Sequence, residues 1–111
     1  MLYLGRINQG TTLRVAANFQ NSADADIDPT TVTFKLFSPS AGTTSYVYGT
    51  DAEISKDSTG DYYIDVTPTE AGRYVYRWVT TGTNQNLAVE GNFVVTASPF
   101  YDEADQDAYR S

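Results

Sequence analysis

The sequence contains neither cysteine nor histidine. Without cysteine, no disulfide can hold the fold and no thiolate can act as a nucleophile or a soft metal ligand. Without histidine there is no imidazole to serve as a general base, which excludes both Ser-His-Asp and Cys-His catalysis. No Gly-rich loop followed by lysine is present to hold a phosphate group. We therefore expect a non-enzymatic protein that needs no cofactor and is stabilised by its hydrophobic core.

Basic residues are also scarce. Seven Lys and Arg face fourteen Asp and Glu, so the formal net charge is -7. This charge opposes long-range attraction to nucleic-acid backbones and to anionic lipid, and we expect neither as a partner. The sequence has no basic segment followed by a long apolar run, which predicts no signal peptide, no membrane span and synthesis in the cytoplasm.

Carboxylates are the remaining candidates for chemistry, because two of them across a cleft suffice for glycoside hydrolysis. Asp61 and Asp65 alternate with apolar residues, which places both on the outward face of one strand. Asp51, Glu53 and Asp57 belong to predicted loops. We interpret all five as solvating charge rather than as catalytic groups.

A polar loop carries Asp24, Asp26 and Asp28 at alternate positions. A calcium ion takes six to eight oxygen ligands from such flexible loops, so calcium binding is an open alternative here. The loop lacks the glycine and the later glutamate of an EF-hand, and Asp28 precedes Pro29, a common turn opener. We therefore predict a turn and no metal site.

Alternating apolar residues dominate the stretch from residue 60 to residue 79. Residues 61–66 and 73–79 each have the period of a half-buried strand, and Pro68 and Gly72 separate them. The residues predicted to face inward are Tyr62, Ile64, Val66, Tyr74, Tyr76 and Trp78. The stretch therefore predicts a strand, a corner and a second strand.

Similar short runs, separated by turn signals at intervals of roughly ten residues, cover the chain up to residue 98. One of them predicts a short strand at 52–55 followed by a turn at 56–60. No segment has helical periodicity. The sequence predicts an all-β fold, specifically an immunoglobulin-like antiparallel β-sandwich of about seven strands that spans residues 1–98.

The corner has a recognisable sequence. Immunoglobulin-like sandwiches often enter one strand through an acidic residue, a small residue and a glycine, followed by a tyrosine whose hydroxyl bonds back to the backbone. Glu70, Gly72 and Tyr74 fit this tyrosine corner. Tyr76 stands two residues later, where antibody domains place a cysteine. We predict a structural role for all of these residues.

Residues 99–111 form a separate acidic and aromatic arm. Four acids make it too polar to join the core, while Phe100, Tyr101 and Tyr109 make it too apolar for a purely solvating tail. Such arms can become ordered on a partner, with the aromatic side chains as anchors. We predict that these three residues bind a partner, with a frayed tail as the alternative.

Several motifs resemble those of small immunoglobulin-like virion proteins of tailed bacteriophages. They are Gly60-x-Tyr62, the corner from Thr67 to Tyr74, Tyr76-Arg77-Trp78 and Glu90-Gly91-x-Phe93-x-Val95. The resemblance implies a structural protein of the virion, made in the host cytoplasm and present in many copies. Its expected partners are the major capsid protein, other virion proteins or further copies of itself.

From this resemblance we expect a capsid decoration, or cement, protein, whose loops 21–28 and 81–86 project at the ends of the sandwich. A protein of the head-tail neck or of the tail is the first alternative. An alternative of another class is a carbohydrate-binding module for host adhesion. For that function the exposed rings of Tyr46, Tyr48 or Tyr63 would stack on sugars.

Overall fold

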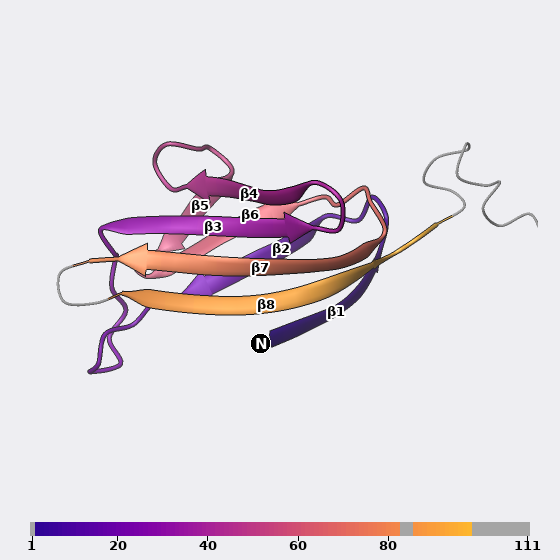
Figure 1. Cartoon of the computed structure of the whole chain (residues 1–111). Helices are drawn as coiled ribbons and strands as arrows, with labels where there is room; N and C mark the ends of the chain where they lie inside the picture. The colour runs from indigo at the N-terminus through magenta and orange to yellow at the C-terminus, as the bar shows by residue number, and fades with distance from the viewer. Residues whose placement is uncertain (1, 83–85, 99–111) are drawn as a thin grey trace, which may run out of the picture.

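The computed structural model describes residues 2–82 and 86–98, and every regular element in these ranges is a β-strand. The eight strands, drawn in Figure 1, are β1 (Leu2–Asn8), β2 (Leu13–Asn18), β3 (Thr31–Ser38), β4 (Gly42–Val47), β5 (Ile54–Ser58), β6 (Asp61–Val66), β7 (Gly72–Thr81) and β8 (Leu87–Thr96). The count exceeds the predicted seven by one. The predicted all-β class is confirmed.

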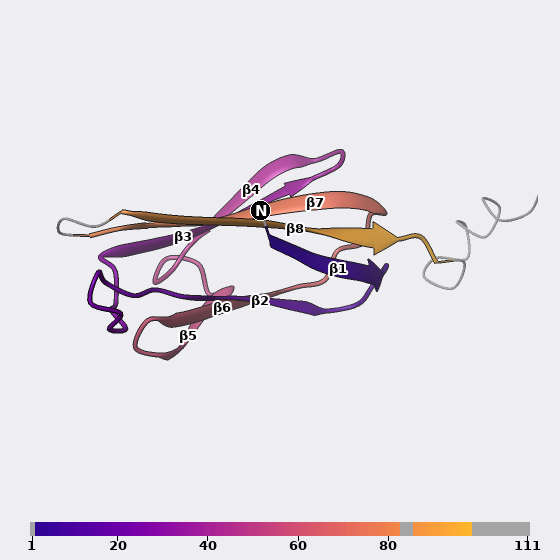
Figure 2. The same ribbon diagram turned by 90° about the horizontal axis from the view of Figure 1, so that it is seen from below.

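The strands form two sheets. The larger sheet has the order β1-β8-β7-β3-β4 and the smaller sheet has the order β2-β6-β5. Figure 1 looks onto the larger sheet, and Figure 2 shows the two sheets as stacked layers. Because β3, β7 and β8 are neighbours in one layer and β2, β6 and β5 in the other, the topology is that of an immunoglobulin-like sandwich.

The first strand departs from the expected antiparallel arrangement. β1 pairs in parallel with β8 along the edge of the larger sheet, whereas all other strand pairs are antiparallel. The chain leaves β1 through the turn at Gln9 and Gly10 and crosses to β2 in the other sheet. Because β1 and β2 lie in different sheets, they do not form an antiparallel hairpin. Alternation of apolar and polar residues along β1 therefore does not reveal whether it runs parallel or antiparallel to its sheet neighbour.

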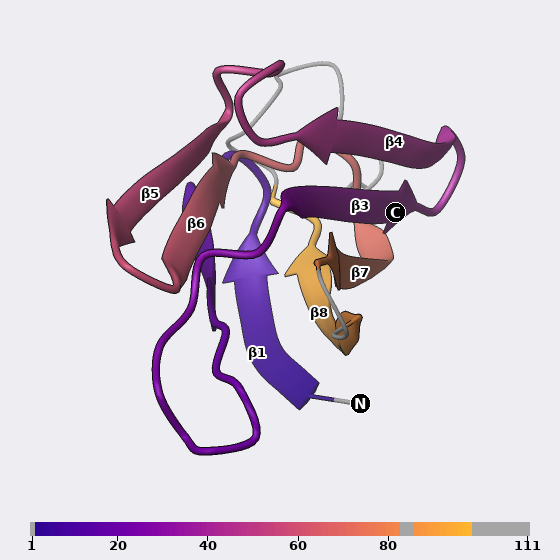
Figure 3. The same ribbon diagram turned by 90° about the vertical axis from the view of Figure 1, so that its left-hand side faces the viewer.

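The core lies between the two layers and is mostly aromatic. Trp78 of β7 is completely buried and packs edge-on against Phe34 of β3, with ring centroids 4.8 Å apart. On its other side, Trp78 meets Phe19 edge-on at 6.3 Å, and Phe19 in turn contacts Tyr62 of β6 at 5.8 Å. Figure 3, viewed along the strands, shows the two layers that these rings join. The predicted inward faces of β6 and β7 are confirmed.

The turn between β5 and β6 is tighter than the predicted turn at 56–60. β5 extends to Ser58 and pairs with β6, so only Thr59 and Gly60 remain for the turn. Gly60 has a φ of 80°, and a Cβ atom placed there would lie 2.7 Å from the carbonyl oxygen of Phe19. Its own carbonyl accepts a hydrogen bond from the Phe19 amide at 2.8 Å. Gly60 therefore permits both the sharp reversal and the close approach of the chain after β2.

We predict that Gly60→Ala lowers the free energy of unfolding by about 2 kcal/mol or more, because it combines left-handed strain with a backbone overlap. Gly49→Ala is the matched control. Gly49 has a similar φ of 87° but open space around its Cβ position, so strain alone should cost about 1 kcal/mol there. Urea denaturation of both variants measures the difference. Equal losses of stability would show that the contact with Phe19 is not limiting.

Candidate functional site

The residues predicted to bind a partner, Phe100, Tyr101 and Tyr109, lie outside the described residues. The same holds for residues 83–85, which form the middle of the predicted projecting loop 81–86. Candidate sites on the rest of the chain must therefore be built from the sandwich itself.

The tyrosine corner holds the start of β7 against the preceding segment. The Tyr74 hydroxyl donates a hydrogen bond to the carbonyl oxygen of Glu70 at 2.9 Å, and the Glu70 amide approaches the same hydroxyl at 3.3 Å. Gly72 has a φ of 136°, and a Cβ atom there would lie 2.6 Å from Cγ of Pro39. Ser40 donates a hydrogen bond to the carboxylate of Glu70. The corner is thus bonded internally and packed against the turn between β3 and β4.

The acidic loop folds back on itself and separates its carboxylates. The Asn21 side chain accepts hydrogen bonds from the amides of Ala23 and Ala25. Asp26 accepts from the side chains of Asn18 and Gln20. Among residues 2–82 and 86–98, no group of three or more acidic side chains is placed to hold a metal ion.

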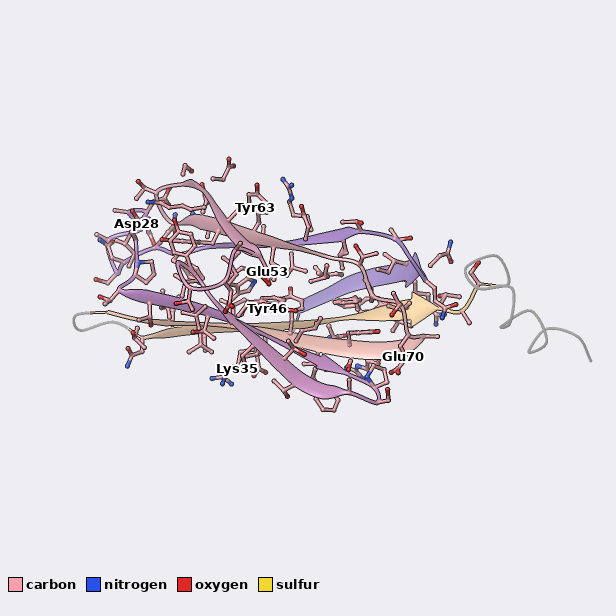
Figure 4. All side chains as sticks on the ribbon, turned by 90° about the horizontal axis from the view of Figure 1, so that it is seen from above. Asp28, Lys35, Tyr46, Glu53, Tyr63 and Glu70 are labelled. Carbon is pink, nitrogen blue, oxygen red and sulfur yellow. The ribbon has the colours of Figure 1, made fainter. Side chains whose placement is uncertain are left out.

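Asp28 joins the loop to the smaller sheet. Its carboxylate accepts hydrogen bonds from Lys56 Nζ at 2.7 Å, from the Gly60 amide at 2.9 Å and from the Tyr62 hydroxyl at 3.2 Å. The bonds from Lys56 and Gly60 hold the pKa of Asp28 below its ordinary value. Burial raises the pKa of Tyr62 to about 12, and the negative charge of Asp28 adds to that effect. Figure 4 labels Asp28 at the loop end of the sandwich.

The carboxylates on the outer surface of the smaller sheet are paired with neighbours on β2. Asp65 accepts two hydrogen bonds from the Arg14 guanidinium, at 2.9 and 3.1 Å, and the ion pair lowers the pKa of Asp65. Asp61 accepts from Asn18 at 2.6 Å and from Ser58 at 2.6 Å, and these bonds lower its pKa. Both groups are held as bonded anions, and neither has the raised pKa that a general acid requires.

The three tyrosines considered for sugar stacking lie in different environments. Tyr46 of β4 pairs with Phe34 and packs against the core, whereas Tyr63 lies on the outer surface of the smaller sheet, as Figure 4 shows. The guanidinium carbon of Arg14 lies 3.9 Å from the centre of the Tyr63 ring and covers it. Tyr48 follows β4 and meets Tyr62 edge-on at 5.1 Å. These rings do not form a shared platform.

The outer surface of the larger sheet is different, because large apolar side chains are exposed on it. The strand register places Phe37, Val75, Asn92 and Tyr3 in one row across β3, β7, β8 and β1. Phe37 is 48% exposed and Tyr3 is 53% exposed. Asn92, between Val75 and Tyr3, is polar and only 6% exposed. We call Phe37, Val75 and Tyr3 the apolar row. Neighbouring strands lie about 4.8 Å apart, so its members are spread over most of the width of the sheet.

Basic residues flank the apolar row on both sides. Arg73 and Arg6 align through Val94 in the row toward the end of β8, and Lys35 aligns with Arg77 in the row on the other side. The only acidic residue in the five strands is Glu90, which pairs with Arg77 at 2.7 Å. We call this surface the docking face and define it by Tyr3, Arg6, Lys35, Phe37, Arg73, Val75 and Arg77.

The docking face is not evident from the sequence, although part of the signal is present there. Phe37 follows the inward row of β3 and falls in the outward phase, where an aromatic residue is unusual. Lys35 and Arg77 occupy the same outward phase on their strands. The alignment of Lys35 with Arg77, and of Phe37 with Tyr3, depends on which strands are neighbours. Alternation along single strands does not carry that information.

Tyr74→Phe is expected to lower the free energy of unfolding by about 1 kcal/mol, because the Glu70 carbonyl loses its buried partner. Tyr76→Phe is the matched control. Tyr76 is buried on the same face of β7, and its hydroxyl makes no hydrogen bond within the described part of the chain. Chemical denaturation of both variants tests the corner, and a Tyr74→Phe protein as stable as the parent would contradict it.

Asp28→Asn should lower stability at neutral pH, and the loss should shrink as the solution is acidified. The pKa of Asp28 is lowered in the folded state, so its stabilisation is present above the unfolded value of 3.8 and disappears as pH falls through the folded pKa. Urea midpoints at about pH 7 and about pH 3 measure the effect. Asp24→Asn, at an exposed position in the same loop, should be neutral at both. A pH-independent loss for Asp28→Asn would exclude the ionic role.

No model of a known protein family and no curated protein matches this sequence. The described residues contain no helix that is long and apolar enough to cross a membrane.

Proposed function

We propose that this protein is a non-enzymatic structural component of a tailed-bacteriophage virion, and that it decorates the capsid as a cement protein on the lattice of the major capsid protein. The observation that carries the proposal is the docking face, which combines an exposed apolar row with flanking cations on an otherwise acidic chain. The resemblance of the strand and corner motifs to small virion proteins supports the phage assignment.

The distribution of charge favours a protein partner. The chain has seven basic residues, and four of them, Arg6, Lys35, Arg73 and Arg77, lie on the strands of the larger sheet. Both cations of the smaller sheet, Arg14 and Lys56, are ion-paired. Protein interfaces commonly place apolar and aromatic groups at the centre and charged groups at the rim, which is the arrangement of the docking face.

The polar groups elsewhere serve the fold rather than a reaction. Asp28, Asp61 and Asp65 accept hydrogen bonds that lower their pKa values, and the sequence supplies neither histidine nor cysteine. A compact sandwich with an exposed apolar and basic surface suits a component that is repeated on a particle, because many modest contacts made together hold it firmly. A ring at the neck or in the tail would use the same properties with a smaller number of copies.

Quantitative mass spectrometry of washed particles from the phage that encodes this chain tests the proposal. A capsid decoration protein should be present in copies on the order of hundreds, because every repeated site of the shell can bind one. Roughly a dozen copies would instead indicate a ring at the neck or in the tail. If the chain is absent from particles that retain their other minor proteins, it is not a virion component.

A further inference from the structure

The docking face and the C-terminal arm have complementary chemistry. We propose that the docking face binds residues 99–111 of a second copy of this chain. The inference goes beyond the proposed function, because it requires no virion component and applies to the purified chain alone.

Charge is the first reason. Within residues 2–82 and 86–98, Arg77 is the one cation of the docking face that forms an ion pair, which leaves Arg6, Lys35 and Arg73 available to an acidic partner. The arm supplies Asp102, Glu103, Asp105 and Asp107 against a single cation, Arg110. The chain as a whole has a net charge of -7, so most of its surface repels the acidic arm. The basic docking face attracts the arm over a long range.

Spacing is the second reason. On the docking face, successive rows are two residues apart along β3, β7 and β8, so the apolar row and either basic row are separated there by about 6.8 Å. Residues two apart in an extended segment have the same separation. Tyr101 and Glu103 have this spacing in the arm, and so do Asp107 and Tyr109. Either pair can place its aromatic ring on the apolar row and its carboxylate beside a basic row.

The end of β8 shows why the arm should come from another copy. The Gln9 amide donates a hydrogen bond to the Thr96 carbonyl at 3.0 Å, and the Gln9 side chain accepts one from the Ser98 amide at 2.8 Å. These two bonds fix the chain beside the turn after β1 as far as Ser98. A return over the chain's own sheet can therefore begin only after that residue.

Both edges of β8 are already paired, one with β1 and the other with β7, so the arm cannot return beside β8 as a hairpin strand. A return over the outer surface of its own sheet would use Phe100 and Tyr101 in the reversal and leave only Tyr109 for the apolar row. An arm from a second copy can place either Tyr101 or Tyr109 there. The contact joins two different surfaces, so each copy can give one arm and receive another, which generates rings or open chains.

Sedimentation velocity of the full chain over a range of concentrations tests the proposal with two charge variants. The face variant is Lys35→Gln/Arg73→Glu, and the arm variant is Asp102→Lys/Glu103→Lys. We expect the parent to self-associate, and we expect this association to weaken as salt is added. Each variant alone should associate at least about tenfold more weakly than the parent. Their equimolar mixture should form a one-to-one complex, because the acidic arm of the face variant meets the unchanged face of the arm variant.

The control is Arg14→Glu/Ala16→Glu, which changes the net charge by the same amount as the face variant but on the outer surface of the smaller sheet. It should associate like the parent. All substituted positions in the sandwich are exposed, so thermal melting should confirm that every variant is folded. The proposal is overturned if the parent is monomeric at every concentration, if the face variant and the control behave alike, or if the mixture does not associate.

Discussion

The packing of Trp78 between Phe34 and Phe19 is the contact on which the rest of the sandwich depends. It joins the two sheets through ring faces and edges in a chain that has no cysteine for an intersheet disulfide. Because side chains alternate along a strand, burying Trp78 also fixes the direction of every other residue of β7. Val75 and Arg77 must then face outward, so the same packing that builds the core also creates the docking face.

The two outer surfaces of the sandwich differ in how their charged side chains are paired. On the smaller sheet, cations and carboxylates neutralise one another at short range, as the pair of Arg14 and Asp65 illustrates. On the larger sheet, three of the four cations form no ion pair with another described residue, and they flank exposed aromatic rings. An acidic chain with one basic surface carries a strong electrical asymmetry. That asymmetry orients encounters with acidic partners before any contact forms.

Many residues that attract attention in the sequence turn out to hold the fold. Asp28 connects a long loop to β5 and β6, and it does so beside Gly60, where the chain passes too close for any side chain. Glu70 and Tyr74 close the corner before β7. Polar groups that are bonded in this way hold the ends of the sandwich together, whereas the proposed binding surface lies on the outer face of the larger sheet.

The sequence by itself determined the fold class, the inward faces of β6 and β7 and the position of the corner, because each depends on local alternation or on turn chemistry. Only the tertiary structure decided that β1 runs parallel to β8 and that β5 continues to Ser58. It also decided that Phe37 and Tyr3 share a row between two rows of cations. These features depend on which strands become neighbours and on the register between them. Strand order and register are set by packing between residues that are far apart in the chain, and no local sequence pattern reports them.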